Sequence, residues 1–97
     1  MERNYTELAD SELAHLARDD DNAFEALYRR YVTPIYRYCY ARTNDAADAE
    51  DLTAQTFMAV VESNDFGRSA RNFPAWLFGI ARHKCADYHR TAYTTQQ

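Results

Sequence analysis

The stretch from Phe73 to Arg90 decides the fold, and it reads FPAWLFGIARHKCADYHR. At 100° per residue, its apolar side chains form one arc along a single helix. The arc consists of Phe73, Leu77, Ile80, Ala81, Cys85 and Tyr88. Asn72 can cap this helix, and Pro74 falls in its first turn, where a missing N–H costs no hydrogen bond. The pattern therefore predicts an amphipathic helix with one buried face.

The opposite side of the same helix is basic. It carries Arg82, His83, His89 and Arg90 around the small residues Gly79 and Ala86, with Trp76 and Asp87 at the border. Cations attract phosphates and an indole can stack on a base, so this side suits nucleic acid. A solvated basic face without a ligand explains the same residues equally well when the helix is taken alone.

Composition limits the chain to one small helical domain. Its 97 residues are 46% hydrophobic and include only two Gly and two Pro, which argues against disorder and against a turn-rich β fold. We expect an all-α fold, a compact bundle of about four helices. The first residues do not read as a signal peptide, and no apolar run approaches the ~20 residues of a membrane span. We therefore expect a cytoplasmic protein without a membrane partner.

The net charge of −4 is unevenly distributed along the chain. Residues 1–62 carry six Arg and thirteen Asp or Glu, whereas residues 63–97 carry four Arg and one Lys against two Asp. Positive charge gathered in one part of a protein can steer an anionic partner even when the total charge is negative. The C-terminal third is therefore the part that we expect to face nucleic acid.

The chain lacks the motifs of an enzyme. It has no Gly-rich phosphate loop, no metal-spaced Cys/His set and no nucleophile elbow, so we expect no catalysis, cofactor or metal. Cys85 and His89 lie one helical turn apart and could form a thiol–imidazole pair, but they belong to different edges of the helix. Cys39 and Cys85 are expected to be reduced thiols in the core, and a disulfide between them stays open.

Two helices are predicted in the first half of the chain. Residues 1–9 are expected to be a flexible N-terminus, followed by a short helix from Ser11 to about Arg18 that Asp10 caps. Asn22, with Glu25 three residues later, resembles a capping box for the next helix.

The second of these helices runs from Ala23 to about Arg42, and its apolar spacing continues past Pro34, which predicts a kink rather than a stop. Its apolar face consists of Phe24, Leu27, Tyr28, Tyr31, Ile35, Tyr38 and Cys39. Its other face interleaves Arg29, Arg30, Tyr36, Arg37 and Tyr40. Interleaved Arg and Tyr could stack on a single nucleic-acid strand, but tyrosines at the rim of a small core are the commoner explanation, which we favour.

A third helix is predicted from Ala46 to about Ser63, after a turn and cap at Asn44 and Asp45. Its inward residues are Ala49, Leu52, Thr53, Phe57, Val60 and Val61. Its start is crowded with carboxylates, and no Lys or Arg occurs between Thr43 and Asn64. Carboxylates at a helix N-terminus complement the helix dipole, whereas the lack of any cation along the helix is what a surface for a basic partner would show. Both interpretations stay open.

The segment from Ser63 to Asn72 is the longest predicted loop. It holds small and polar residues with Arg68 and Arg71, and it can form one wall of a pocket whose other wall is the helix that follows. After Arg90 the apolar pattern is lost, so the predicted helical domain covers residues 10–90 and residues 91–97 are expected to be a linker stub.

Several motifs occur together in the order of a known family. They are Asp48-Ala49-Glu50-Asp51-Leu52-Thr53 with Phe57, a Gly/Arg/Ser loop, Trp76-Leu77-Phe78-Gly79-Ile80-Ala81-Arg82 with Asp87 and Arg90, and Ala23-Phe24-Glu25-Ala26-Leu27-Tyr28 with Tyr31. Together they resemble the second conserved region of the extracytoplasmic-function (ECF) sigma factors, which are bacterial subunits for transcription initiation. The resemblance covers most of the chain, from Asp10 to Arg90.

The resemblance implies two partners. The helix that carries Asp48, Glu50, Asp51 and Gln55 would dock on a coiled coil of the clamp of core RNA polymerase. The loop and the helix after it would melt the promoter −10 element by capturing its non-template strand, with one base flipped into the loop. The implied DNA-binding residues are Arg68, Ser69, Arg71, Asn72, Trp76, Arg82, His83 and Arg90. An anti-sigma factor is a further partner to consider.

Three departures from the family pattern bear on these expectations. Ala54 replaces the usual Gln of the polymerase-binding helix, so part of that contact is expected to be weaker. Gly79 and His83 replace Arg and Asn, which leaves the preferred promoter sequence open. The family's domain that reads the −35 element is missing, so we expect an isolated domain or a reduced family member. The competing hypothesis is a stand-alone helical protein-interaction module that mimics a sigma domain without binding DNA.

Overall fold

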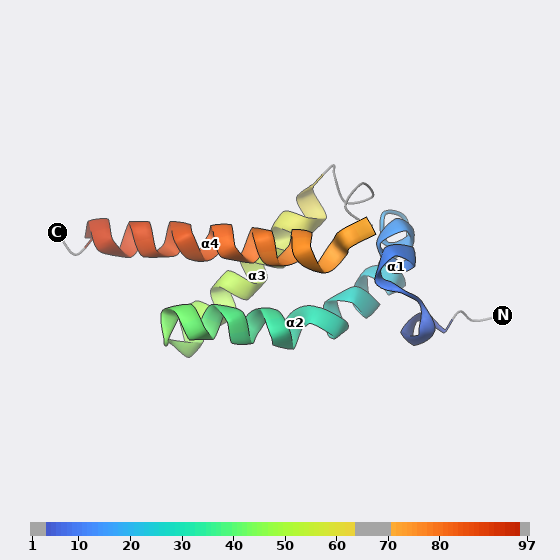
Figure 1. The fold of residues 1–97 in the computed structure, drawn as a ribbon, viewed down its shortest axis with the longest axis horizontal. Helices are drawn as coiled ribbons and strands as arrows, with labels where there is room; N and C mark the ends of the chain where they lie inside the picture. The colour runs from blue at the N-terminus through green and yellow to red at the C-terminus, as the bar shows by residue number, and fades with distance from the viewer. Residues whose placement is uncertain (1–3, 64–70, 96–97) are drawn as a thin grey trace.

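Four α-helices make up most of the described chain. The computed structural model describes residues 4–63 and 71–95, which form a 3-10 turn η1 (Tyr5–Glu7) and the helices α1 (Asp10–Ala17), α2 (Asp21–Thr43), α3 (Ala46–Glu62) and α4 (Phe73–Thr95) (Figure 1). The predicted all-α bundle is therefore confirmed, and none of these helices is apolar enough over a sufficient length to cross a membrane.

The three longer helices run side by side. In Figure 1, α2 and α4 point in the same direction, and α3 returns between them at an angle. Contacts join α3 to both α2 and α4, and α2 to α4 directly. The short α1 packs against α2 at the end where α4 begins, so it closes that end of the bundle.

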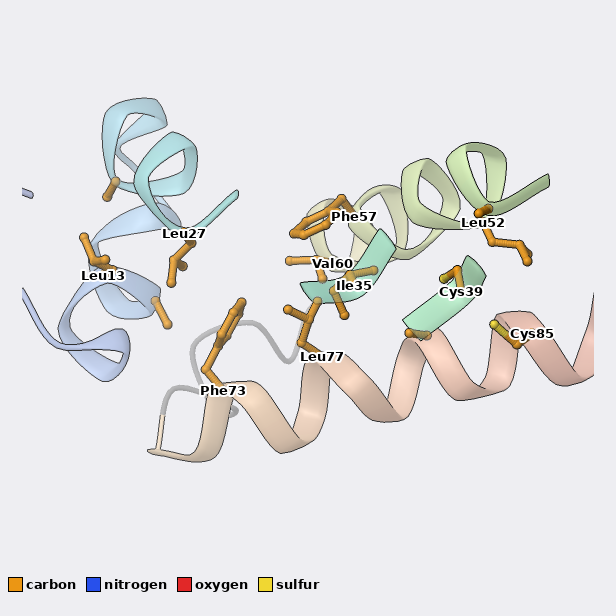
Figure 2. Close-up of a cluster of buried hydrophobic side chains, with 14 residues drawn as sticks. Leu13, Leu27, Ile35, Cys39, Leu52, Phe57, Val60, Phe73, Leu77 and Cys85 are labelled. Atoms are coloured by element: carbon orange, nitrogen blue, oxygen red, sulfur yellow. The ribbon is translucent and has the colours of Figure 1, made fainter. Parts of the chain in front are cut away.

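The core follows the apolar arc predicted for α4. Phe73, Leu77, Ala81 and Cys85 are at most 1% exposed, while Ile80 and Tyr88 lie at its edge. Figure 2 shows Phe73, Leu77 and Cys85 of α4 among buried residues of the other helices, which include Leu13, Leu27, Ile35, Cys39, Leu52, Phe57 and Val60. Because α4 touches the other three helices, its buried face determines how they assemble.

Two of the predicted helix caps differ from those in the structure. Asp10 is not a cap: it is the first residue of α1, and its carboxylate accepts hydrogen bonds from Arg30 and Tyr31 instead. Asn22 is not a cap either, because the Asp20 carboxylate accepts the Asn22 N–H at 2.9 Å. The capping-box prediction is therefore wrong, and the carboxylate of Glu25 binds Arg29.

The structure also bears on two further predictions, one for the N-terminal residues and one for Pro34 in α2. Residues 4–8 are not simply a flexible end, because Tyr5 in η1 donates its hydroxyl to Asp20 at 2.5 Å. The helix continues through Pro34, as its apolar spacing predicts, and ends at Thr43. Asn44 then adopts a left-handed conformation with φ of 57°, which turns the chain toward α3.

The inner face of α3 agrees with the prediction except at its end. Asp45 caps the helix by accepting the Asp48 N–H at 2.9 Å. Val61 is 62% exposed, so its assignment to the core was wrong, whereas Thr56 is fully buried. The Thr56 hydroxyl tolerates burial because it donates to the Leu52 carbonyl at 2.8 Å.

The last helix is longer than expected. It continues to Thr95, past the predicted end at Arg90, while the assignment of residues 91–97 to a linker stays a prediction. Once a helix has nucleated, each further residue adds a backbone hydrogen bond at little cost, even where no apolar face supports it. An apolar pattern therefore predicts too early an end for such a helix.

Candidate nucleic-acid and protein interfaces

The predicted DNA-binding residues of α4 lie on its outer side. Arg82, His83 and Arg90 are exposed, and Trp76 is half-buried with its ring 6.0 Å from that of Phe73. Arg90 also donates to the carboxylate of Asp87 one turn earlier. The basic outer side expected from the sequence is therefore present on α4.

These residues form two strips rather than one. Trp76, His83 and Arg90 recur every seven residues and so lie along one strip of α4. Arg82 is about 120° around the helix from Trp76 and lies one turn after Phe78. Trp76, His83 and Arg90 thus share one side of α4 at intervals of about 10 Å, and Arg82 shares another side with Phe78.

Only the ends of the predicted loop, Ser63 and residues 71–72, lie within the described residues. Arg71 and Asn72 are exposed directly before α4, where their side chains can reach a ligand bound along that helix. Arg68 and Ser69 lie outside the described residues. The predicted pocket between the loop and α4 therefore stays a prediction.

The acidic helix exposes most of the residues predicted to meet a protein. Glu50, Asp51 and Gln55 are all exposed on α3, and Gln55 donates its side-chain N–H to the Asp51 carboxylate at 2.7 Å. Asp48 differs, because it is half-buried and accepts the Tyr88 hydroxyl at 2.6 Å. The structure therefore sets Asp48 apart from the other three residues.

Sequence reasoning missed the apolar part of this surface. Met58 is 56% exposed and lines a shallow pocket of about 320 Å³ together with Asp51, Gln55 and Glu62 from α3 and Lys84 from α4. The sequence could have indicated an exposed Met58, because this residue lies three positions after Gln55 and outside the predicted apolar face. An exposed methionine beside carboxylates provides an adaptable apolar contact for a protein partner.

Most basic and aromatic residues of α2 are already engaged. Arg29 forms an ion pair with Glu25, and Arg30 forms one with Asp10 at 2.7 Å. Of the two tyrosines on the same face of α2, Tyr36 is partly buried against the core, as the rim interpretation predicts, whereas Tyr40 is 42% exposed. Tyr36 stacks on the more exposed Tyr40, with ring centroids 6.1 Å apart.

The cysteines and histidines form no catalytic arrangement among the described residues. Cys39 and Cys85 are buried free thiols that approach each other between α2 and α4 (Figure 2). Burial, and then the neighbouring Cys85, raise the pKa of Cys39 to about 11. His89 is exposed and contacts Tyr88, so it does not join Cys85, and no group of three potential ligands within residues 4–63 and 71–95 could hold a metal ion.

Comparison with known proteins identifies the family. The model of the Sigma-70 region 2 family matches residues 27–94, which include all of α3 and nearly all of α4. The chain therefore belongs to the Sigma-70 region 2 family, and the resemblance stated from its motifs is confirmed. No solved structure matches the chain significantly.

Several curated relatives of the chain are named ECF RNA polymerase sigma factors. The chain is 42% identical over 72 residues to the ECF RNA polymerase sigma factor BldN of Streptomyces coelicolor, covering 73% of this chain and 27% of that protein. It is 37% identical over 68 residues to the ECF RNA polymerase sigma factor SigL of Mycobacterium tuberculosis, covering 69% and 38%. For the ECF RNA polymerase sigma factor SigM of Bacillus subtilis the identity is 34% over 67 residues, covering 68% and 40%. The chain thus spans less than half the length of each of these relatives.

Proposed function

We propose that this chain is the promoter-opening domain of an ECF sigma factor, which docks on core RNA polymerase and captures the non-template strand of the −10 element. The observation that carries the proposal is the separation of charge between two helices: α3 exposes Glu50 and Asp51 and contains no Lys or Arg, while α4 exposes Arg82 and His83. Such a division suits one basic protein partner and one polyanion. The role is one of binding in the cytoplasm, not of catalysis.

Docking on polymerase uses the outer face of α3. Asp51 and Gln55 hold each other in place, which fixes a carboxylate and an amide for a basic coiled coil of the clamp. Met58 adds an apolar contact beside them. Asp48 supports this surface from behind through Tyr88, so it acts in docking by fixing the start of α3 and not by touching the partner.

Capture of DNA uses the loop and the outer side of α4. Trp76 offers an indole on which an unpaired base can stack. His83 and Arg90 lie about 10 Å and about 21 Å further along the same strip of α4, where they can neutralise phosphates of the neighbouring nucleotides. Arg71 and Asn72 approach the same ligand from the start of the helix, together with Arg68 and Ser69 of the loop. Because binding relies on cations, it must weaken as salt is added.

The alternative, a sigma-mimicking protein-interaction module without DNA binding, is disfavoured. Such a module would need the acidic helix but not the basic one. A pure protein-binding module could dispense with α4, but the family match continues through this helix as far as residue 94.

Polymerase docking can be tested with one charge reversal and its control. Asp51→Arg should abolish association of the domain with core polymerase while leaving its circular dichroism spectrum unchanged, because Asp51 is exposed. Asp19→Arg changes the net charge equally at an exposed turn far along the chain and should bind like the wild type. Retained association of the Asp51 variant would remove α3 from the interface.

DNA capture can be tested with a single-stranded −10 oligonucleotide, alone and in the presence of core polymerase. Trp76→Ala and Arg82→Ala should each weaken binding, and the exposed Arg82 can be replaced without loss of the fold. If three or four phosphates are neutralised, the log–log salt slope should be about −2 to −3 for a single strand. Binding that ignores both substitutions and salt would contradict the proposal.

A further inference from the structure

The seam between α2 and α4 is lined by cations and partly exposed aromatic rings, of which the proposed −10 site uses Arg82 alone. Tyr38 of α2 meets Phe78 of α4 edge to face, with ring centroids 5.7 Å apart. The Arg42 guanidinium lies over the Tyr38 ring, 4.2 Å from its centroid. Both rings are partly buried and Arg42 is exposed, so the seam presents a cation backed by aromatic rings.

A further cation flanks this cluster from α4. Arg82 follows Phe78 by one turn, whereas Arg37 of α2 lies about 100° around its helix from Tyr38 and so faces away from the ring. Both side chains are exposed, and within residues 4–63 and 71–95 neither has an ion-pair partner. Arg29 and Arg30, in contrast, are engaged by carboxylates nearer the start of α2.

Few carboxylates occur on the two helices that form the seam. No Asp or Glu occurs between Glu25 and Asp45, which covers most of α2. On α4 the acidic residue is Asp87, which lies nine residues after Phe78 and so about 180° around the helix. At the start of α3, the Asp45 carboxylate accepts the Asp48 N–H, and the Asp48 carboxylate accepts the Tyr88 hydroxyl.

We infer that this α2–α4 seam is a second contact surface for single-stranded DNA, separate from the strip of Trp76, His83 and Arg90. The inference rests on the proposed function, because it takes the captured strand as the ligand. An arginine held over a ring is already ordered, so it loses little conformational freedom when it binds a phosphate. The neighbouring rings supply the faces and edges on which bases and sugars pack. Arg82 belongs to this surface and links it to the rest of α4.

The inference can be tested with a single-stranded DNA oligonucleotide and the whole chain. Arg42→Ala should weaken binding about fivefold at 0.1 M salt, because one phosphate contact contributes about 0.7 to the log–log salt slope of a single strand. The salt slope itself should become shallower by the same ~0.7. Phe78→Leu should weaken binding without changing the slope, because it removes a ring and no charge.

Two controls separate this surface from general electrostatics and from the proposed −10 site. Arg18→Ala removes the same charge from the exposed end of α1, at the opposite end of the bundle, and should leave the salt slope unchanged. Arg42→Lys keeps the charge but loses the planar group, so it should preserve the slope and recover part of the affinity. Thermal unfolding of each variant verifies that the fold persists.

Failure of the inference differs from failure of the proposed function. If Arg42→Ala and Phe78→Leu bind like the wild type while Trp76→Ala binds weakly, the seam is not a DNA surface and the proposed −10 site stands. If Arg18→Ala flattens the slope as much as Arg42→Ala, the effect is one of net charge and the inference is wrong. If the wild type binds no single strand even with core polymerase, both proposals are wrong.

Discussion

Tyr88 of α4 donates its hydroxyl to the carboxylate of Asp48, 2.6 Å away at the start of α3. The two residues are 40 positions apart in the sequence, and their bond fastens the acidic helix to the basic one. This hydrogen bond, followed by partial burial and the negative charge of Asp48, raises the pKa of Tyr88 above its ordinary value. An aspartate that a motif assigns to a partner surface is thus already engaged within the domain.

Stability should fall at alkaline pH because of tyrosines bound to carboxylates. The pKa values of Tyr88 and Tyr31 are raised, the latter chiefly by burial and by its hydrogen bond to Asp10. Above pH ~10 the folded protein therefore holds protons that the unfolded chain releases, so the free energy of unfolding decreases as pH rises. The contribution is fully present below pH ~10 and disappears as pH passes the folded pKa values. Urea unfolding between about pH 8 and 11 measures it.

The matched variants for this pH dependence are phenylalanines. Tyr88→Phe and Tyr31→Phe should each lower stability at neutral pH but show a shallower decline at alkaline pH. Tyr40→Phe removes an exposed hydroxyl and should follow the wild-type curve. If the free energy of unfolding of the wild type stays constant up to pH ~11, the tyrosines do not cause a loss of stability at alkaline pH.

The Asp10 carboxylate should contribute more to stability than an exposed ion pair. It accepts hydrogen bonds from Arg30, at 2.7 Å, and from Tyr31, and so ties α1 to α2. The Asp10 and Arg30 side chains are only 25% and 31% exposed, so Asp10→Ala should lower the free energy of unfolding by about 1–3 kcal/mol. Glu25→Ala, which breaks an exposed pair within α2, should cost less than about 0.5 kcal/mol. Equal losses in urea unfolding would show that the tie is unimportant.

Two apolar residues should respond very differently to truncation. Leu77→Ala should lower the free energy of unfolding by about 2–5 kcal/mol, because the side chain is fully buried and leaves a cavity. Val61→Ala should change it by less than about 0.5 kcal/mol, because the side chain is 62% exposed. Chemical denaturation measures both, and a large loss for the Val61 variant would place that residue in the core after all.

The thiols should react slowly in the folded protein. Cys39 and Cys85 are at most 1% exposed, and burial raises the pKa of Cys39 to about 11, so little thiolate is present at pH 8. A chromogenic disulfide reagent should label neither thiol at neutral pH until urea opens the bundle, after which both should react. Rapid labelling of Cys39 in the native protein would indicate that α4 separates readily from α2.

The helical spacing of apolar residues was a reliable guide to the fold. It located α2, α3 and α4 and most of their buried faces, because each face depends on residues three and four positions apart in the same helix. It failed at Val61, since a residue at the edge of a face is buried only if a neighbouring helix extends that far. It also ended α4 too early, because an exposed helix end needs no apolar pattern.

The candidate sites were less predictable than the fold. The motifs placed Asp48 with Asp51 and Trp76 with Arg82, since they are close in the sequence. The tertiary structure turns Asp48 toward Tyr88. The helical period alone places Arg82 on the side of Phe78 and about 120° from Trp76. Met58 escaped notice because exposure of an apolar side chain depends on which helix face is left uncovered.

The sequence by itself determined the four helices, the direction of their apolar faces and the membership of the family, because local spacing and motifs suffice for these. Only the tertiary structure decided which carboxylates accept hydrogen bonds from another part of the fold, as at Asp10, Asp20 and Asp48, and which stay exposed on their own helix, as at Asp51. The physical reason is that a hydrogen bond between helices requires two side chains to meet within about 3 Å. Packing of the whole core sets such distances, and the order of residues along one helix does not.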